Sequence, residues 1–267
     1  MVMQIDIFVR THDRQNVHND WRTRYAKMGK RELIQGCFNS LLNAVEYVKD
    51  HNVRLTVLDD HSSPEFVEWL KEKQKKRYFH IIHNEEKGYR YSAHQQFLKC
   101  RDSDADLVYC VEDDYLHTET AIQEMIDTYV LFSERLGQKN IVLYPFDAPE
   151  IYNPPKDQCL LVHGSNRHWR TGHYTTNVMF TIPKIFRDHW PLFEVLSLNY
   201  NGDYLRKEEE KDKHIRYEEA NTIWNIWKAG HAMRFNPIPS IALHMQFDAQ
   251  WDPFIEWKQW WKDYAEE

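Results

Sequence analysis

The sequence predicts an α/β protein with a mostly parallel, doubly wound central sheet, and two observations support this. Apolar runs with strand character alternate with segments of helical periodicity through residues 5–136. Such an alternation favours parallel strands with helices on both faces of the sheet. Polar residues follow each expected strand. No glycine-rich phosphate loop follows the first strand, which argues against dinucleotide-binding and P-loop enzymes.

The first half of the chain contains the more regular elements. Strands are expected at residues 5–9, 53–58, 78–82 and 107–111, and helices at residues 33–48, 66–75, 92–100 and 118–136. The helix at 66–75 has a clear start, because Pro64 lies in the first turn after Ser62 and Ser63. We expect the strands and helices of this half to follow one another in the order βαβαβαβ.

The second half is less regular. Strands are expected at residues 141–146, 174–182, 232–235 and 240–245, a helix at 217–229, and an irregular loop over 150–172. A last helix is expected over 254–264, with aromatic residues at helical spacing. That stripe is expected to pack on the body of the protein, since a membrane-surface helix would contain more bases than acids.

Composition restricts the function classes. The net charge of −7 over 267 residues argues against a general nucleic-acid binder. No apolar run is long enough to span a membrane, and the N-terminus lacks the pattern of a signal peptide. The four cysteines show no metal-binding spacing, so we expect reduced thiols and a cytoplasmic protein.

Polar residues at the ends of the strands are expected to face one crevice. They are Thr11, Asp13 and Arg14 after the first strand, Asp59 and Asp60 after the second, Asn84 after the third, and Glu112, Asp113 and Asp114 after the fourth. Ligands of open α/β sheets bind at the carboxyl ends of the strands. For each side chain alone, capping of a turn or helix is the alternative.

The acid triplet Glu112-Asp113-Asp114 is the strongest chemical signal. Like charges this close raise each other's pKa and repel. A hard divalent cation compensates for that repulsion, because Mg²⁺ and Mn²⁺ take carboxylate oxygens as ligands. The alternative is a polar turn that closes a strand.

The order of these motifs resembles the family-two glycosyltransferases of the GT-A fold over nearly the whole chain. The matching segments are residues 11–14, 59–63, 84–93, the acid triplet, the helix from Glu218 to Gly230, and the strand that ends at His244. The departure is Glu219, where the family has an aspartate. The resemblance implies a nucleotide-sugar-binding half (1–115), an acceptor-binding half (116–250) and an aromatic C-terminal helix (251–267).

The resemblance also implies roles for individual residues. Asp114, with Glu112 and His244, would bind Mn²⁺ or Mg²⁺, and Glu219, with Glu218 beside it, would be the general base. The nucleoside-diphosphate sugar, expected to be a UDP-sugar, would contact Thr11, Asp13, Arg14, Asp59, Asp60, Asn84 and Asp113. A base on the face opposite the leaving group implies an inverting reaction.

The acceptor is left open by the sequence. A glycan is one alternative, and a hydroxymethylated DNA base, as modified by phage-type enzymes, is another. The long basic loop from His12 to Arg31 and the stretch from His163 to His173, which contains Arg167, Trp169 and Arg170, are interpreted as acceptor contacts. A nucleotidyltransferase and an inactive sugar-binding module on the same fold are the remaining alternatives.

Overall fold

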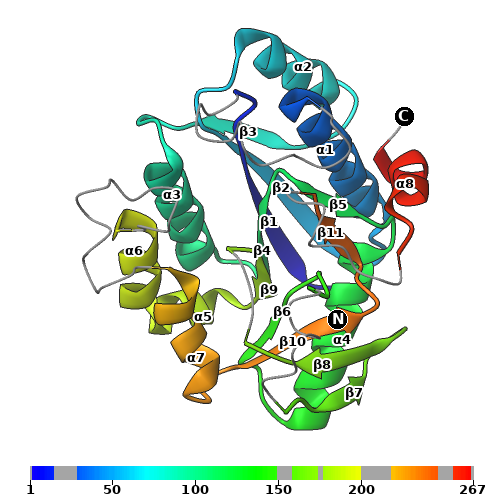
Figure 1. Cartoon of the computed structure of the whole chain (residues 1–267), viewed down its shortest axis with the longest axis vertical. Helices are drawn as coiled ribbons and strands as arrows, with labels where there is room; N and C mark the ends of the chain where they lie inside the picture. Colours follow the sequence, from blue (N-terminus) through cyan, green and yellow to red (C-terminus); the bar gives the residue numbers. More distant parts are fainter. Residues whose placement is uncertain are drawn as a thin grey trace.

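A nine-stranded sheet forms the centre of the protein, with strands in the order β3-β2-β1-β4-β9-β6-β10-β8-β7, and β5 and β11 form a separate pair (Figure 1). The structure is a computed structural model that describes residues 2–14, 29–148, 158–173, 177–199, 218–245 and 255–265. Helices cover both faces of the sheet. The predicted α/β class with a mostly parallel central sheet is confirmed.

The first four strands of the large sheet are parallel. β1 (Gln4–Thr11) lies between β2 (Asn52–Asp59) and β4 (Leu107–Glu112), and β3 (His80–His83) lies outside β2. Thr11 pairs with Asp59 and Arg10 pairs with Glu112. The polar residues at the ends of these strands therefore share one edge of the sheet, as predicted.

The other half of the sheet is mixed. β6 (Ile141–Leu143) runs parallel to β10 (Met233–Ile238), whereas β9 (Met179–Thr181) is antiparallel to β4 and β6. β7 (Leu161–His163) and β8 (His168–Thr171) form an antiparallel hairpin at the edge. The prediction of a loop over 150–172 is therefore wrong in its second part. The sequence pattern did not predict these short strands, because they are rich in His and Arg and lack a period-2 apolar pattern. Residues 149–157 lie outside the described part of the chain.

Two cores lie on the two faces of the sheet. α1 (Lys30–Tyr47), α2 (Pro64–Gln74) and α4 (Ala121–Leu136) cover one face, while α3 (Tyr89–Asp102), α5 (Pro183–Asp188), α6 (Trp190–Asn199) and α7 (Trp224–Lys228) cover the other (Figure 1). Side chains alternate between these cores along β1, so that Ile7 and Val9 enter the first and Phe8 enters the second.

The small sheet connects two distant parts of the sequence. β5 (Tyr115–His117) pairs antiparallel with β11 (Ala242–His244), and His244 lies opposite Tyr115. The residue after the acid triplet is therefore the neighbour of His244. Sequence reasoning had missed β5, which is only three residues long.

The helix predicted over 217–229 is wrong as a single element. The structure has a 3₁₀ turn, η5 (Glu219–Asn221), then α7, with Thr222 between them at φ −123° and ψ −97°. The Thr222 hydroxyl donates to the carbonyl of Glu218 at 2.7 Å. A hydroxyl bond of this kind competes with the helical hydrogen bonds and explains the break. Tyr217 lies outside the described residues.

The aromatic C-terminal segment packs on the body, as predicted. α8 (Trp257–Trp260) continues into a π-helical turn, η7 (Trp261–Ala265), against α1. Gly36 allows this approach, because a Cβ atom there would lie 2.3 Å from the Trp261 ring. Phe254 lies outside the described residues. No helix in the described ranges has the length and apolarity needed to cross a bilayer.

Candidate functional site

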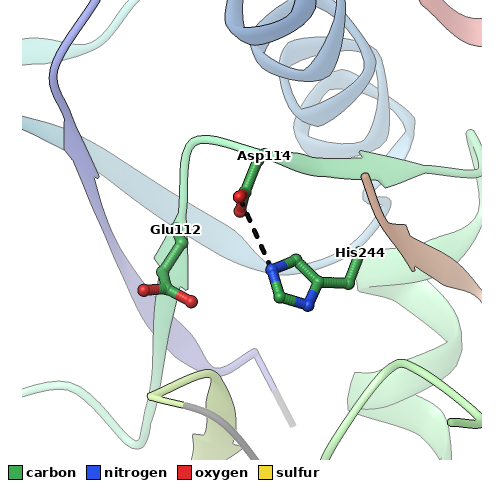
Figure 2. A group of neighbouring side chains, drawn as sticks. All are labelled: Glu112, Asp114 and His244. Atoms are coloured by element: carbon green, nitrogen blue, oxygen red, sulfur yellow. Dashed lines mark ion pairs between the residues drawn. The ribbon is translucent and has the colours of Figure 1, made fainter. Parts of the chain in front are cut away.

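Glu112, Asp114 and His244 meet at the carboxyl edge of the sheet (Figure 2). Glu112 ends β4, Asp114 precedes β5, and His244 ends β11. One ligand atom from each lies within 4.8 Å of the others, and His244 Nε2 is 3.5 Å from Asp114 Oδ2. Two carboxylates and one imidazole are ligand types that Mn²⁺ accepts, so this donor set fits a divalent cation.

Packing fixes the His244 ring. It is 4% exposed and stacks on Tyr115, with the ring centroids 4.7 Å apart and the planes at 11°. The Tyr115 hydroxyl lies 2.9 Å from the hydroxyl of Tyr144. Met245 N donates to the Asp114 carbonyl at 2.8 Å, so a backbone hydrogen bond joins the segment that contains His244 to the segment that contains Asp114. The imidazole is thus held toward Asp114 by the β5–β11 pair.

Arg10 is a site residue that sequence reasoning missed. Its guanidinium forms an ion pair with Glu112 and lies 4.4 Å from the centre of the Tyr89 ring. Burial raises the pKa of Glu112; Arg10 opposes this effect, and the nearby Asp114 charge adds to it. The available signal was an arginine directly after the apolar run Ile7-Phe8-Val9 of the strand, where a buried charge needs a partner.

Glu219 belongs to the same electrostatic cluster. Burial, together with the charges of Glu112 and Glu218, raises the pKa of Glu219 to about 7, although Arg10 opposes the shift. A carboxyl group with this pKa is suited to accept a proton near neutral pH. Glu218 precedes Glu219 at the start of η5. The structure thus brings Glu219 within electrostatic reach of Glu112 and Arg10, with Glu218 next to it in the chain.

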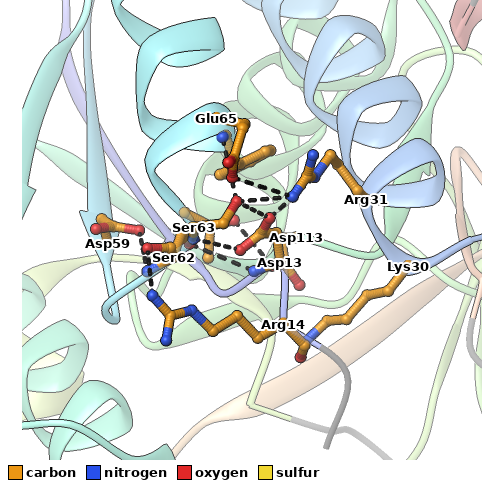
Figure 3. Close-up of polar contacts among 11 residues, drawn as sticks. Asp13, Arg14, Lys30, Arg31, Asp59, Ser62, Ser63, Glu65 and Asp113 are labelled. Atoms are coloured by element: carbon orange, nitrogen blue, oxygen red, sulfur yellow. Dashed lines mark hydrogen bonds and ion pairs between the residues drawn. The ribbon is translucent and has the colours of Figure 1, made fainter.

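Asp13 joins the ends of β1 and β2 (Figure 3). It accepts hydrogen bonds from Ser63 N at 2.6 Å and from Arg31 Nε at 3.0 Å. Burial opposes ionisation, but the hydrogen bonds from Ser63 and Arg31 outweigh it and lower the pKa of Asp13. Arg14 donates to the Ser62 carbonyl at 3.4 Å. These contacts hold the start of α2 against the segment after β1.

The neighbouring aspartates are hydrogen-bonded to backbone and side-chain groups of the same edge. Asp59 accepts from Ser62 N at 3.2 Å, and Asp60 accepts from Gly88 N at 3.0 and 3.1 Å. Asp59 and Asp60 are only 2% and 5% exposed. Asn84 N donates to the Asp59 carbonyl at 2.9 Å. Both carboxylates therefore hold the turns at this edge of the sheet.

Asp113 points toward β1 rather than toward the other two acids of the triplet. It accepts from Thr11 Oγ1 at 2.9 Å and from His12 N at 2.8 Å. Burial raises the pKa of Asp113 even though Lys30 opposes the shift. The middle acid of the triplet thus fixes the end of β1. The outer two acids, Glu112 and Asp114, belong to the cluster of metal ligands with His244.

The interpretation of Arg167, Trp169 and Arg170 as acceptor contacts is wrong. Trp169 is fully buried. Arg167 pairs with Glu124 and donates to the carbonyls of Pro239 and Ser240, and Arg170 pairs with Asp147. These side chains stabilise the core around β8. Most of the basic segment after β1, residues 15–28, lies outside the described part of the chain.

Comparisons with known proteins agree with the fold of the chain. Residues 27–130 match the model of glycosyl transferase family 2. No curated protein sequence matches the chain. Among solved structures, GalNAc-T7 with UDP, GalNAc and Mn²⁺ superposes with a TM-score of 0.50 at 10% identity, covering 93% of this chain and 44% of that one.

Two further structures are similar at lower scores. TarS of S. aureus has a TM-score of 0.49 at 11% identity, covering 88% of this chain and 36% of that one. The mannosyltransferase PcManGT of Pyrobaculum calidifontis, in complex with GDP-Man and Mn²⁺, has a TM-score of 0.41 at 13% identity, covering 70% and 47%. The chain thus spans less than half the length of each of the three proteins.

Proposed function

Because the chain has the fold of GalNAc-T7 and residues 27–130 match glycosyl transferase family 2, we propose that it moves a sugar from a nucleoside-diphosphate sugar to an acceptor hydroxyl with the help of a divalent cation. One observation supports this above all others. The potential metal ligands Glu112, Asp114 and His244 meet at the edge of the sheet where Glu219 interacts electrostatically with Glu112. The family match also makes a nucleotidyltransferase the weaker alternative.

Glu112, Asp114 and His244 would hold Mn²⁺ or Mg²⁺. When bound, such a cation neutralises the negative charge that develops on the leaving diphosphate. The ion pair with Arg10 orients Glu112, and the stack on Tyr115 orients His244. The protein therefore supplies ligands whose positions are set before the donor arrives.

Glu219 is the proposed general base. The acceptor oxygen attacks the anomeric carbon while the bond from that carbon to the diphosphate oxygen breaks, and the hydroxyl proton passes to the Glu219 carboxylate. Its pKa of about 7 makes the carboxylate a stronger proton acceptor than an ordinary glutamate. In-line attack inverts the anomeric configuration. Glu218 is the alternative base, being the adjacent residue.

The nucleotide half, residues 1–115, is proposed to bind the donor through Thr11, Asp13, Arg14, Asp59, Asp60, Asn84 and Asp113. Asp13 and Asp113 act mainly by holding the walls of the pocket, since their oxygens already accept hydrogen bonds from the chain. Asn84 is 8% exposed, and its Nδ2 has no hydrogen-bond partner among the described residues. That amide is therefore a buried hydrogen-bond donor without an acceptor in the described part of the chain, which is why we keep Asn84 in the proposed donor set.

The acceptor half, residues 116–250, is proposed to bind a glycan hydroxyl. A hydroxymethylated base in DNA is the second candidate, supported by seven cations against two acids in residues 10–31. Two of those cations, Arg10 and Arg31, are paired with carboxylates, which weakens the DNA alternative. We place the protein in the cytoplasm, where the buried thiols of Cys37, Cys100 and Cys110 stay reduced.

The direct test is a donor screen. Purified protein is incubated with UDP-, GDP-, CDP- and ADP-sugars in Mn²⁺, Mg²⁺ or EDTA, and nucleotide release and sugar transfer are measured by mass spectrometry with glycan and DNA acceptors. We expect slow metal-dependent hydrolysis of one donor class, accelerated by the true acceptor. Failure to bind or hydrolyse any donor in the presence of metal would refute the proposal.

A further inference from the structure

Two histidines lie directly opposite each other in the β7–β8 hairpin, at the end of the large sheet away from β3 (Figure 1). His163 ends β7 and His168 begins β8, and residues 164–167 form the turn between them. Opposite residues of an antiparallel pair project to the same side of a sheet. The ring centroids of the two histidines are 5.3 Å apart, and the ring planes meet at 80°. We call His163 and His168 the hairpin histidine pair.

The hairpin histidine pair projects away from the core. The next pair in the ladder, Val162 and Trp169, packs in the core on the side of α1 and α4. Because side chains alternate along a strand, His163 and His168 project from the opposite face, and both are exposed. Among the described residues neither imidazole has a hydrogen-bond or ion-pair partner. Each neutral ring therefore offers one acceptor nitrogen that a solvated ion can reach.

The separation of the two rings matches the one that a shared metal ion requires. A Zn²⁺ ion lies about 2.0–2.1 Å from a coordinating imidazole nitrogen, and therefore about 3.2 Å from the centroid of that ring. Two imidazoles at tetrahedral positions around one ion then have their centroids about 5.2 Å apart. The observed distance between the ring centroids is 5.3 Å. Both imidazoles can therefore bind one ion without a shift of the strands.

Contacts with α4 hold the hairpin in place. Within the turn, Gly164 N donates to the Arg167 carbonyl at 2.8 Å. Three side-chain contacts connect the hairpin to α4, namely Ser165 with Thr128, Arg167 with Glu124, and Arg135 with the carbonyl of His163. A ligand that binds to an already ordered segment pays little for ordering the chain. The hairpin therefore presents the two imidazoles in a fixed arrangement before an ion arrives.

We propose that the hairpin histidine pair is a second metal site, which binds a transition-metal cation such as Zn²⁺ or Ni²⁺ and joins β7 to β8. Imidazole nitrogens favour these ions, whereas Mg²⁺ and Mn²⁺ favour oxygen ligands such as those of the acidic cluster. Water completes the coordination of the ion. The positive charge of Arg135 near the turn opposes a bound cation, so the affinity is below that of a closed four-ligand site. This site does not depend on the proposed function.

The test is calorimetric titration of the whole chain with Ni²⁺, Zn²⁺ and Mn²⁺ in excess Mg²⁺, which competes for the acidic cluster but not for imidazoles. His163→Asn and His168→Asn should each lower the Ni²⁺ affinity about tenfold or more, because one ligand of a chelating pair is lost. Ni²⁺ should raise the Tm of wild type more than that of either variant. The matched control is His231→Asn. His231 also lies close to another histidine, His189, at 5.2 Å between centroids, but the two belong to separate connections, after α7 and after α5.

The outcomes separate this site from its alternatives. Equal Ni²⁺ affinity in wild type, His163→Asn and His168→Asn would show that the two rings make only an edge-to-face contact, and the proposal would be overturned. A loss of affinity in His231→Asn but in neither hairpin variant would assign the ion to the other pair and overturn it equally. Tighter binding of Mn²⁺ than of Ni²⁺ to wild type would contradict the ligand class. A failed donor screen would leave the hairpin site unaffected.

Discussion

Two groups of acids at one edge of the sheet are used in opposite ways. The anchoring acids (Asp13, Asp59, Asp60 and Asp113) accept hydrogen bonds from backbone and side-chain groups of the turns that they join. Among the clustered acids (Glu112, Asp114 and Glu219), burial raises the pKa of Glu112 and of Glu219, and the charge of Asp114 on Glu112 and of Glu112 on Glu219 adds to it. The anchoring acids stabilise the turns that they join. The clustered acids repel one another, and binding of a cation or a proton would reduce that repulsion.

The difference shows that residue type alone does not assign function at such an edge. Asp113 and Asp114 are adjacent in the sequence, yet Asp113 bonds to Thr11 while Asp114 faces His244. The partner of each carboxylate decides its role, because a hydrogen-bonded carboxylate is stable alone whereas neighbouring carboxylates attract a counter-ion. Substitutions in the two groups should therefore have distinguishable effects.

The largest effect is expected for Asp114→Asn. The amide keeps the size of the side chain but removes a charged metal ligand from the cluster. Loss of metal-assisted stabilisation of the leaving group costs several kcal/mol, so turnover should fall by ~10³-fold or more. Titration with Mn²⁺ should show weaker binding. The matched control is Asp127→Asn on the exposed face of α4, which should keep wild-type turnover.

If Asp114→Asn binds Mn²⁺ and turns over the donor like wild type, Asp114 is not a metal ligand, and its assignment to the clustered acids is wrong. A fall in turnover accompanied by a large fall in Tm would instead move Asp114 into the anchoring group.

A smaller effect is expected for Glu219→Gln. The amide cannot accept a proton, so transfer should fall by about 10²-fold or more, while donor affinity stays within about twofold of wild type. Single-turnover transfer and nucleotide titration separate the two quantities. Glu218→Gln is the matched control at the adjacent position. If Glu218→Gln loses transfer and Glu219→Gln does not, Glu218 is the base.

The pH dependence gives a third test. The base must be deprotonated, and its pKa is raised to about 7, so kcat/KM should fall about tenfold for each pH unit below that value and level off above it. The residual activity of Glu219→Gln should lack this acid limb. A wild-type profile that is flat between about pH 5 and 8 would contradict the assignment.

Sequence reasoning placed the parallel half of the fold well, for a physical reason. β1, β2 and β4 are buried on both sides and appear as apolar runs, and the polar residues at their ends must then share an edge. Asp59, Asp60 and Asp114 therefore could be placed together without coordinates. His244 was matched only through the family resemblance, since its contact depends on β5, three residues long.

Other features were beyond reach because they depend on distant partners. Arg10 looked like one more cation of a basic stretch, and only the pairing of β1 with β4 brings it to Glu112. Arg167 looked exposed and available, but Glu124, more than forty positions earlier on α4, neutralises it in the folded chain. Charge in a sequence predicts attraction to a ligand only when no internal partner exists.

The smallest effect, seen mainly as a loss of stability, is expected in the anchoring group for Asp13→Asn. The variant keeps the shape but removes the negative charge that accepts hydrogen bonds from Ser63 and Arg31, which should cost ~2 kcal/mol, or about 5 °C in Tm. The pKa of Asp13 is lowered from its ordinary 3.8 by folding, so its stabilising effect is present above that value and lost as the pH falls through the lower, folded value. The gap in Tm between wild type and variant should therefore be constant near neutral pH and close below about pH 4. Asp188→Asn, which removes an exposed ion pair with Lys184, is the control and should change stability by less than ~1 kcal/mol. A stable Asp13→Asn with reduced metal binding would place Asp13 among the clustered acids.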